Sequence, residues 1–167
     1  MFSIIHMSIK IIPLHKCPDY APILAYWSYN EWYRNREIKF DLVMKSHISY
    51  SKDNLLPYSF VAFYRDYPVG MVSFKENDLW SRKDINPWLS SLYVVPDYRK
   101  MGIAQKLINS VLEKAEMMNY NGIYLFFRDS NDEDLDKFYR NRGWEFYDNA
   151  IDNDGHNTKI FLFNLNQ

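Results

Sequence analysis

The chain has 167 residues, of which 47% are hydrophobic and 25% are charged, and its 20 basic residues nearly balance its 21 acidic ones. This size and composition predict one globular domain over residues 1–167, and the net charge of -1 argues against a general nucleic-acid binder, which usually has a basic excess. A single cysteine cannot form an internal disulfide, and the four histidines are scattered, so the sequence indicates no metal site.

The N-terminal stretch MFSIIHMSIKIIPLH has no basic start and no apolar run of signal-peptide length. No window of the sequence approaches the ~20 apolar residues that a membrane-spanning helix needs. These two features predict a cytoplasmic protein.

The hydrophobic pattern of the first half predicts one strand, then two helices, then a β-hairpin. The first strand ends at Pro13, and Pro22 is tolerable because it falls in the first turn of the following helix. The turn RDYP separates the two apolar runs of the hairpin. In chain order, the predicted elements are a strand over residues 8–12, helices over 19–34 and 38–48, and strands over 58–64 and 69–76.

The second half alternates strands and helices before it ends in two more strands. Its longest helix carries an apolar stripe at i, i+3 and i+4 spacing, and its short helix begins with acidic residues that suit the helix dipole. The resulting order, β-α-α-β-β-β-α-β-α-β-β, indicates a mixed α/β domain rather than a run of βαβ units. The predicted elements are a strand over 88–95, a helix over 102–118, a strand over 122–127, a helix over 132–141, and strands over WEFYD and TKIFLFNL.

The stretch VVPDYRKMGIAQKL leads from an apolar strand into the strongest amphipathic helix. A helix N-terminus presents about four unpaired amides and a partial positive charge, so it attracts an anion. Gly102 and Ala104 are small enough for the backbone to approach a phosphate, while Arg99 and Lys100 add positive charge. Taken alone, these residues favour an ordinary strand-to-helix turn, because the spacings of a P-loop and of a dinucleotide fingerprint are both absent.

Two longer patterns give this turn a context. The first is L-x-V-x-P-x-x-R-x-x-G-x-A, from Leu92 to Ala104, and the second is F-Y-x-x-x-G-W, from Phe138 to Trp144. Together with the order of elements, they make the sequence resemble the GCN5-related N-acetyltransferase (GNAT) family. The segments ENDLWSRKDINPWLSSLYV and NEWY are similar to a bacterial subgroup of that family, so the resemblance extends over nearly the whole chain from Ser8.

The resemblance implies a GNAT-like acyl-CoA N-acyltransferase fold, which is α/β with a central, mostly antiparallel sheet flanked by helices. It implies acetyl-CoA as cosubstrate, with the pyrophosphate on the amides of the first motif and the pantetheine arm along the strand before it. The family often has a cosubstrate-binding asparagine seven residues before the motif tyrosine, where this chain has Asp132; helix capping explains the neighbouring Asn131 equally well. The implied cofactor-binding residues are Leu92, Tyr93, Val94, Arg99, Lys100, Met101, Gly102, Ile103, Ala104 and Asn131.

The resemblance further implies direct attack of a primary amine on the thioester, with Tyr139 as the general acid. A phenol of pKa ~10 can give its proton to the departing thiolate, because thiols titrate near ~8.5. Leu135, Phe138 and Tyr139 also share one face of a helix, so Tyr139 equally suits a core position. A backbone N–H near Leu92 to Val94 would stabilise the oxyanion.

The sequence points less clearly to a general base and an acceptor site than to the general acid. Glu76 and Asp78 follow the third strand, and each fits either a base or a solvated loop acid. Asp78 also matches the Asp-Leu pair of the bacterial subgroup, which favours it slightly over Glu76 for a local role. Aromatic rings of the first helical pair and of the loop before the fourth strand would wall the acceptor, where they would stack on a flat or cationic group. The candidates for this wall, which also fit ordinary packing positions, are Trp32, Tyr33 and Trp88.

Three functions are compatible with these residues. The favoured one is an acetyltransferase acting on a small-molecule or protein amine, because Tyr139 and nearby acids are present. The alternatives are a non-catalytic acyl-CoA sensor and a nucleotide-binding domain unrelated to coenzyme A. We expect no nucleic-acid or membrane partner, and either a monomer or a homodimer.

Overall fold

The computed structural model describes residues 8–52, 55–129 and 133–166, without the side chain of Glu133. Asn131, one of the cofactor-binding residues that the family resemblance implies, lies outside these described residues. The chain forms two compact units, one of residues 1–73 and 91–110 and the other of residues 74–90 and 111–167.

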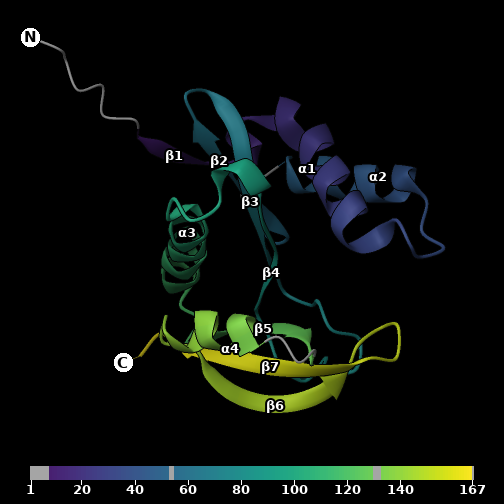
Figure 1. Cartoon of the computed structure of the whole chain (residues 1–167), viewed down its shortest axis with the longest axis vertical. Helices are drawn as coiled ribbons and strands as arrows, with labels where there is room; N and C mark the ends of the chain where they lie inside the picture. The colour runs from purple at the N-terminus through teal and green to yellow at the C-terminus, as the bar shows by residue number, and fades with distance from the viewer. Residues whose placement is uncertain (1–7, 53–54, 130–132, 167) are drawn as a thin grey trace, which may run out of the picture. The chain divides into compact units, whose positions relative to one another are not determined.

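Within the described residues, seven strands form one sheet in the order β1-β2-β3-β4-β5-β7-β6, with helices flanking it (Figure 1). This confirms the predicted mixed α/β fold. Pairing is antiparallel for β1 with β2, β5 with β7 and β6 with β7, and parallel for β4 with β5. The strands are β1 (Ile9–Pro13), β2 (Tyr58–Tyr64), β3 (Tyr67–Lys75), β4 (Trp88–Val94), β5 (Gly122–Arg128), β6 (Glu145–Ile151) and β7 (Asn157–Asn164).

The helices lie close to their predicted positions, but the first one is divided. The segment predicted as one helix over residues 19–34 has a 3-10 turn, an α-helix and a π-helical turn in succession. In the π turn the Arg34 N–H reaches back five residues to the Tyr29 C=O, at 2.7 Å. The α-helices are α1 (Ala21–Ser28), α2 (Phe40–Tyr50), α3 (Ile103–Met117) and α4 (Glu133–Arg140); the short turns are η1 (Leu14–Lys16), η2 (Pro18–Tyr20), the π turn η3 (Tyr29–Tyr33) and η4 (Pro96–Tyr98).

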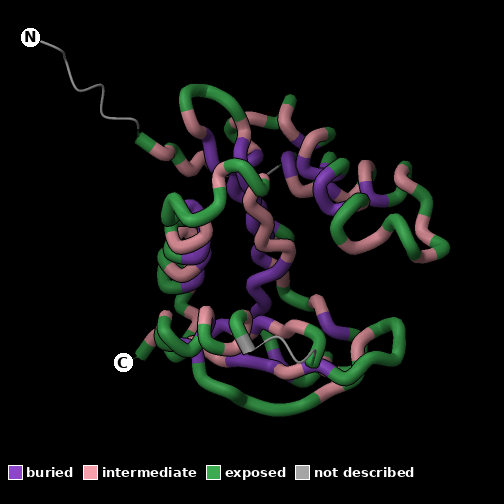
Figure 2. The backbone as a smooth tube through the Cα atoms, in the orientation of Figure 1, coloured by how far each residue is buried: buried purple, intermediate pink, exposed green. Residues whose placement is uncertain are grey.

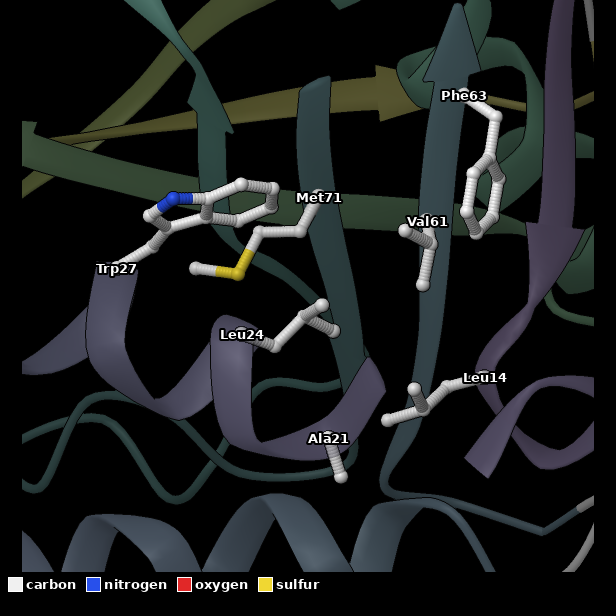
Figure 3. Close-up of a cluster of buried hydrophobic side chains, with 7 residues drawn as sticks. All are labelled: Leu14, Ala21, Leu24, Trp27, Val61, Phe63 and Met71. Carbon is white, nitrogen blue, oxygen red and sulfur yellow. The ribbon is translucent and has the colours of Figure 1, made fainter. Parts of the chain in front are cut away.

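The core of the first unit lies between α1 and the strands β2 and β3. Residues three apart on a helix share a face, and alternate residues on a strand share a face, so each element presents one apolar side. Figure 3 shows the side chains that meet there, all buried and drawn from α1, β2, β3 and η1. They are Leu14, Ala21, Leu24, Trp27, Val61, Phe63 and Met71.

Strands β2 and β3 form the predicted hairpin. Arg65 and Asp66 in the turn both have positive φ, 49° and 67°, which is the backbone of a type I′ turn and suits the twist of antiparallel strands. Across the hairpin, the hydroxyl oxygens of Ser59 and Ser73 lie 2.9 Å apart in a buried hydrogen bond. The pair therefore satisfies two polar groups that would otherwise be costly to bury.

The second unit has its own core and an exposed edge strand. Trp88, at the start of β4, is fully buried with Leu79, Ile85 and Ile160. Strand β6 ends the sheet order and is exposed along nearly all its length, in contrast to the buried β2 and β3 (Figure 2).

Helix α3 buries the apolar stripe that was predicted for it, although the shorter helix α4 is the more strongly amphipathic. Its inward side chains are fully or almost fully buried, whereas Met117 at its last residue is exposed. Among the described residues, each helix is too short or too polar to cross a membrane. The buried stripe consists of Ile103, Leu107, Ile108, Val111 and Ala115.

Candidate active site

The turn between β4 and α3 forms a backbone concavity in the first unit. After η4, Lys100 and Gly102 take positive φ of 62° and 76°, and Met101 between them does not. Alternation of left- and right-handed residues points successive N–H groups toward one place, which is the geometry of an anion-binding nest. Lys100 is a non-glycine residue in the left-handed region, a conformation that is uncommon and is found where a turn demands it.

The head of α3 adds further amides to this concavity. The Lys106 N–H donates to the Gly102 C=O at 3.2 Å, which is the first backbone bond of the helix. The amides before Lys106 therefore have no carbonyl one turn earlier in the helix to receive them. A Cβ at Gly102 would meet no heavy atom within 4 Å, so the space in front of this turn is open. An oxyanion fits the combination of open space, converging amides and the helix dipole.

The two basic side chains of the turn have different roles. The Arg99 Nε donates to the Val94 C=O at 3.0 Å, so this guanidinium is anchored to the end of β4. Lys100 is exposed. Arg99 is exposed as well, but its hydrogen bond to Val94 closes the turn on itself.

The backbone N–H and C=O groups along β4 point alternately to the two sides of the strand. The Val95 N–H donates to the Val69 C=O at 2.9 Å, and a Cβ on Gly70 would stand 2.8 Å from the Tyr93 carbonyl oxygen. Tyr93 and Val95 therefore direct their backbone polar groups toward β3. Leu92 and Val94 direct theirs to the opposite side, where the Val94 C=O already accepts from Arg99, so the Leu92 N–H and C=O and the Val94 N–H are the groups that suit an added extended ligand.

Ser91 marks a break in the regular course of β4. Its φ is 54°, and a non-glycine residue with left-handed φ inside a strand is typical of a β-bulge. In the parallel ladder of β4 with β5, Trp88 pairs with Tyr124, and this pair precedes the break. The sequence analysis missed Ser91, because a serine carries no signal for a left-handed conformation.

The side chain of Tyr93 faces α1 rather than the turn. Its ring lies 5.5 Å from the Trp27 ring, and it packs beside the buried cluster of Figure 3. Burial raises the pKa of the Tyr93 phenol, and the nearby negative charge of Glu31 raises it further. Glu31 lies on the π turn η3, so this turn brings a carboxylate close to Tyr93 of β4 within the first unit.

Helix α4 delivers Tyr139 into an apolar cage of the second unit. The side chain is 8% exposed, and its ring stacks on Phe127 at 5.7 Å between centroids, with Phe138 and Trp144 edge-on to it. Burial raises the pKa of Tyr139 to about 12, although the positive charge of Arg142 acts against that rise. The phenol is therefore protonated at neutral pH, as a proton donor must be and a proton acceptor must not.

The two candidate bases differ in their surroundings. The Asp78 carboxylate accepts a hydrogen bond from the Lys75 Nζ at 2.9 Å, and both side chains are largely buried, at 16% and 13% exposed. Glu76 is exposed, and its charge raises the pKa of the Tyr120 phenol beyond the effect of burial. Asp78 thus has an ion-pair partner and a structural role, whereas Glu76 faces solvent.

The three candidates for the acceptor wall differ in how far they are buried. Trp88 is fully buried and its Nε1 donates to the Ile85 C=O at 3.0 Å, so it cannot contact an acceptor and is a core residue. Trp32 is half-buried against the first unit's core, and Tyr33 is half-buried under the guanidinium of Arg36 at 5.4 Å. Both lie on the π turn η3.

The loop before β4 offers a different tryptophan. Trp80 is 74% exposed and lines an open hollow of about 400 Å³ in the second unit. Its backbone N–H donates to Asn153 Oδ1 at 3.2 Å, and the Ser81 hydroxyl donates to the Ile151 C=O at 2.7 Å. These bonds tie the loop to the turn between β6 and β7. The sequence analysis missed Trp80, although it named this loop as part of the acceptor wall.

A group of three possible metal ligands lies in the β6–β7 turn. One ligand atom each of Asp152, Asp154 and His156 falls within 4.8 Å of the others. Arg128 donates to both carboxylates, from its Nε to Asp152 at 2.8 Å, so a guanidinium already offsets part of their charge. Although burial alone would raise it, hydrogen bonds from the His156 and Asp154 amides and from Arg128 lower the pKa of Asp152 to about 2.

Solved structures with this architecture are numerous in one family. A protein assigned to the GNAT acetyltransferases from Desulfovibrio desulfuricans aligns over 95% of this chain and 99% of its own, with a TM-score of 0.74 at 10% identity. NAA60 of Arabidopsis thaliana, solved in complex with acetyl-CoA, aligns over 96% of this chain and 100% of its own, with a TM-score of 0.71 at 18% identity. A spermidine N-acetyltransferase SpeG chimera from Vibrio cholerae gives 0.69 at 17% identity, over 95% and 96% of the two chains.

At these identities the structural likeness establishes the fold. The sequence itself matches the profile of the acetyltransferase (GNAT) family over residues 22–144, a stretch that runs from α1 through the turn between β4 and α3 to the end of the F-Y-x-x-x-G-W motif. With the fold and the sequence in agreement over most of its length, the chain belongs to the acetyltransferase (GNAT) family.

Proposed function

We propose that this protein transfers the acetyl group of acetyl-CoA to a primary amine by direct attack, with both units acting as a single acetyltransferase domain. The observation that carries the proposal is the concave turn of Lys100 to Gly102 at the head of α3, in a chain of the acetyltransferase family. The acetyl-CoA bound to the Arabidopsis relative supports the choice of cosubstrate.

The pyrophosphate occupies the open space in front of Gly102, on amides of Met101 to Ala104, with Lys100 supplying charge. The pantetheine arm pairs with the backbone of Leu92 and Val94, on the side of β4 opposite to β3. The alternation of β4 supports this assignment, since the groups of Tyr93 and Val95 are directed to β3. The Val94 N–H or the Leu92 N–H then stabilises the oxyanion that forms when the amine attacks.

Tyr139 donates its proton to the departing CoA thiolate. Its protonated state at neutral pH and its position in the F-Y-x-x-x-G-W motif support this role. Glu76 accepts the proton of the attacking amine, directly or through water. We prefer Glu76 to Asp78 because the Asp78 carboxylate is already paired with Lys75 inside the loop.

The acceptor is a small-molecule or protein amine in a cytoplasmic setting. Aromatic side chains would line the acceptor site, where flat or cationic groups beside the attacking amine would stack on their rings. Trp32 and Tyr33 on the π turn stay in this role, and exposed Trp80 takes the place of buried Trp88 in the loop before β4. The spermidine acceptor named for the Vibrio relative places polyamines first in an acceptor panel.

An acceptor screen tests the proposal. The protein is mixed with acetyl-CoA and a panel of polyamines, aminoglycosides and peptides, and a thiol-detecting reagent measures the coenzyme A that is released. We expect release of free thiol with at least one amine, and Tyr139→Phe should slow it by about 10²-fold while coenzyme A affinity stays unchanged. Heat on binding coenzyme A with no thiol release from any amine would favour the sensor. Thermal stabilisation by ATP or NAD and not by coenzyme A would favour an unrelated nucleotide-binding domain.

A further inference from the structure

The open hollow beside Trp80 in the second unit lies where the loop before β4 meets the β6–β7 turn. Its volume is about 400 Å³, and it is lined by Trp80, Ser81, Ile151, Asp152 and Asn153. Two hydrogen bonds join its sides, from the Trp80 N–H to Asn153 Oδ1 at 3.2 Å and from the Ser81 hydroxyl to the Ile151 C=O at 2.7 Å. Because the loop and the turn are bonded to each other, the hollow has a defined shape.

The indole of Trp80 supplies a flat apolar wall. The Lys83 Nζ lies over the ring, 4.5 Å from its centroid, so an ammonium already occupies one face. The residue is nevertheless largely exposed, so the ring keeps open surface where it lines the hollow. The face of an aromatic ring is the negative part of its quadrupole, and it attracts the weakly positive C–H groups of a ligand.

The Asn153 amide and the Ser81 hydroxyl supply hydrogen-bonding groups. A backbone N–H can only donate, so the Asn153 atom that faces the Trp80 N–H is the amide oxygen, and this bond fixes the orientation of the amide. No described residue accepts a hydrogen bond from Asn153 Nδ2, which therefore keeps two donors for a ligand. The Ser81 oxygen donates its proton to Ile151 and still has lone pairs with which to accept.

The electrostatics of the hollow do not favour a cation. Asp152 is the acidic residue of its lining, but this side chain is only 7% exposed. Its Oδ1 accepts from the Asp154 and His156 N–H groups, both at 2.9 Å, and its Oδ2 accepts from the Arg128 Nε at 2.8 Å. Both oxygens are therefore engaged within the turn, and the Lys83 ammonium on the ring would repel a second cation. A neutral ligand is the better match.

We propose that this hollow binds a neutral, polyhydroxylated ring, namely a pyranose. The C–H face of the sugar lies on Trp80, one hydroxyl accepts from Asn153 Nδ2, and another donates to Ser81 Oγ. A hydroxyl is both donor and acceptor, so one sugar satisfies both kinds of group, which neither a hydrocarbon ring nor an ammonium does. The inference goes beyond the proposed function, because this binding needs neither acetyl-CoA nor turnover.

The size of the hollow agrees with this ligand. Small-molecule sites have volumes of ~300–1,000 Å³, so about 400 Å³ is near the lower end of that range and suits a single ring. Exposed Ile151 adds apolar surface beside the indole. A ligand held by one aromatic face and a few hydrogen bonds on an open surface binds weakly, so we expect a Kd of ~1 mM.

Ligand-observed NMR tests the binding on the whole protein. Saturation-transfer difference spectra with methyl glucoside, methyl galactoside and methyl mannoside should give a saturable signal for at least one of them. In protein labelled with 5-fluorotryptophan, the fluorine resonance that Trp80→Phe removes should be the one that this glycoside shifts. Neither 1,6-diaminohexane nor calcium should shift it. Silence with all three glycosides, or a larger shift with the diamine or with calcium, would overturn the proposal.

Three variants identify the groups that bind. Trp80→Ala removes the ring but keeps the backbone bond to Asn153, so it should abolish the glycoside signal without lowering the melting temperature. Asn153→Asp keeps an oxygen for the Trp80 N–H and replaces the two donors by an acceptor, so it should weaken binding about two- to tenfold. Tyr67→Ala is the control, because this ring of the first unit is 70% exposed against 74% for Trp80. Full affinity in Asn153→Asp, or an equal loss in Tyr67→Ala, would contradict the proposal.

A kinetic comparison distinguishes a free glycoside from a sugar that is part of the acceptor. Ethanolamine and 2-aminoethyl glucoside present the same amine without and with the sugar. If the acceptor carries the sugar, Trp80→Ala should raise KM for the glucoside by about tenfold and leave KM for ethanolamine unchanged. If the ligand is a free glycoside, both amines should respond alike while methyl glycoside binding persists. If no amine gives thiol, the proposed function fails, and the NMR titration still decides whether the hollow binds a sugar.

Discussion

The open space in front of Gly102 makes a quantitative prediction, and Gly155 provides a matched control. Both glycines have left-handed φ, 76° and 85°, and a Cβ on either would meet no heavy atom within 4 Å. Alanine at either position should therefore cost about 1–2 kcal/mol of backbone strain and no steric clash. In a chain of this length that loss lowers the melting temperature by about 2–8 °C, and it should be similar in the two variants.

Gly102→Ala and Gly155→Ala should differ in their affinity for coenzyme A. A methyl group at residue 102 occupies the space that the pyrophosphate needs, and losing one amide hydrogen bond to a charged oxygen costs about 1.5–3 kcal/mol. Titration calorimetry should therefore show at least about tenfold weaker binding for Gly102→Ala, and unchanged binding for Gly155→Ala. Pantetheine, which lacks the pyrophosphate, should bind both alike. Equal coenzyme A affinity in the two variants would refute the anion turn.

Three further changes give sharp outcomes. Gly70→Ala places a Cβ 2.8 Å from the Tyr93 carbonyl oxygen, so urea unfolding should show a loss of about 1–3 kcal/mol and calorimetry a weaker coenzyme A complex. Asp78→Asn removes the pair with Lys75, so it should lower the melting temperature but keep the rate of thiol release; a collapse of the rate would make Asp78 the base. Since the pKa of Asp152 is lowered from 3.8 to about 2, its carboxylate stabilises the fold above pH 4 and loses that effect as pH falls through 2; Asp152→Asn should flatten acid unfolding in this window.

The sequence was a good guide to the fold because most elements follow one clear hydrophobic period. Strand β2 has its predicted bounds, and α3 buries the apolar stripe expected of it. The division of the first helix was not foreseen, because YNEWY has ordinary helical spacing and only the hydrogen bond from Arg34 to Tyr29 shows the wider turn. Local sequence patterns do not report on such a change of backbone bonding.

The candidate site was predictable where the motif acts through the backbone. Gly102 was expected at the strand-to-helix turn because of its small size, and it lies there with a left-handed φ that had not been predicted. Side-chain roles were harder to foresee because they depend on burial and partners from distant segments. The PWL segment drew attention to Trp88, yet tertiary packing buries that ring and exposes Trp80 in the same loop. The local pattern at Asp78 likewise gave no sign of its ion pair with Lys75.

The number of residues in the π turn after α1 determines the direction of the aromatic side chains that we propose for the acceptor wall. A π turn contains one more residue than an α turn, and Trp32 and Tyr33 both fall inside it. Deleting a single exposed residue there, such as Asn30, would close the same turn with one residue fewer and restore ordinary helical winding. The side chains of Trp32 and Tyr33 inside the turn would then change direction, while the residues after it would keep theirs. If these two residues contact the acceptor as proposed, a one-codon deletion would alter the range of amines that the protein accepts, with no substitution in the aromatic residues themselves.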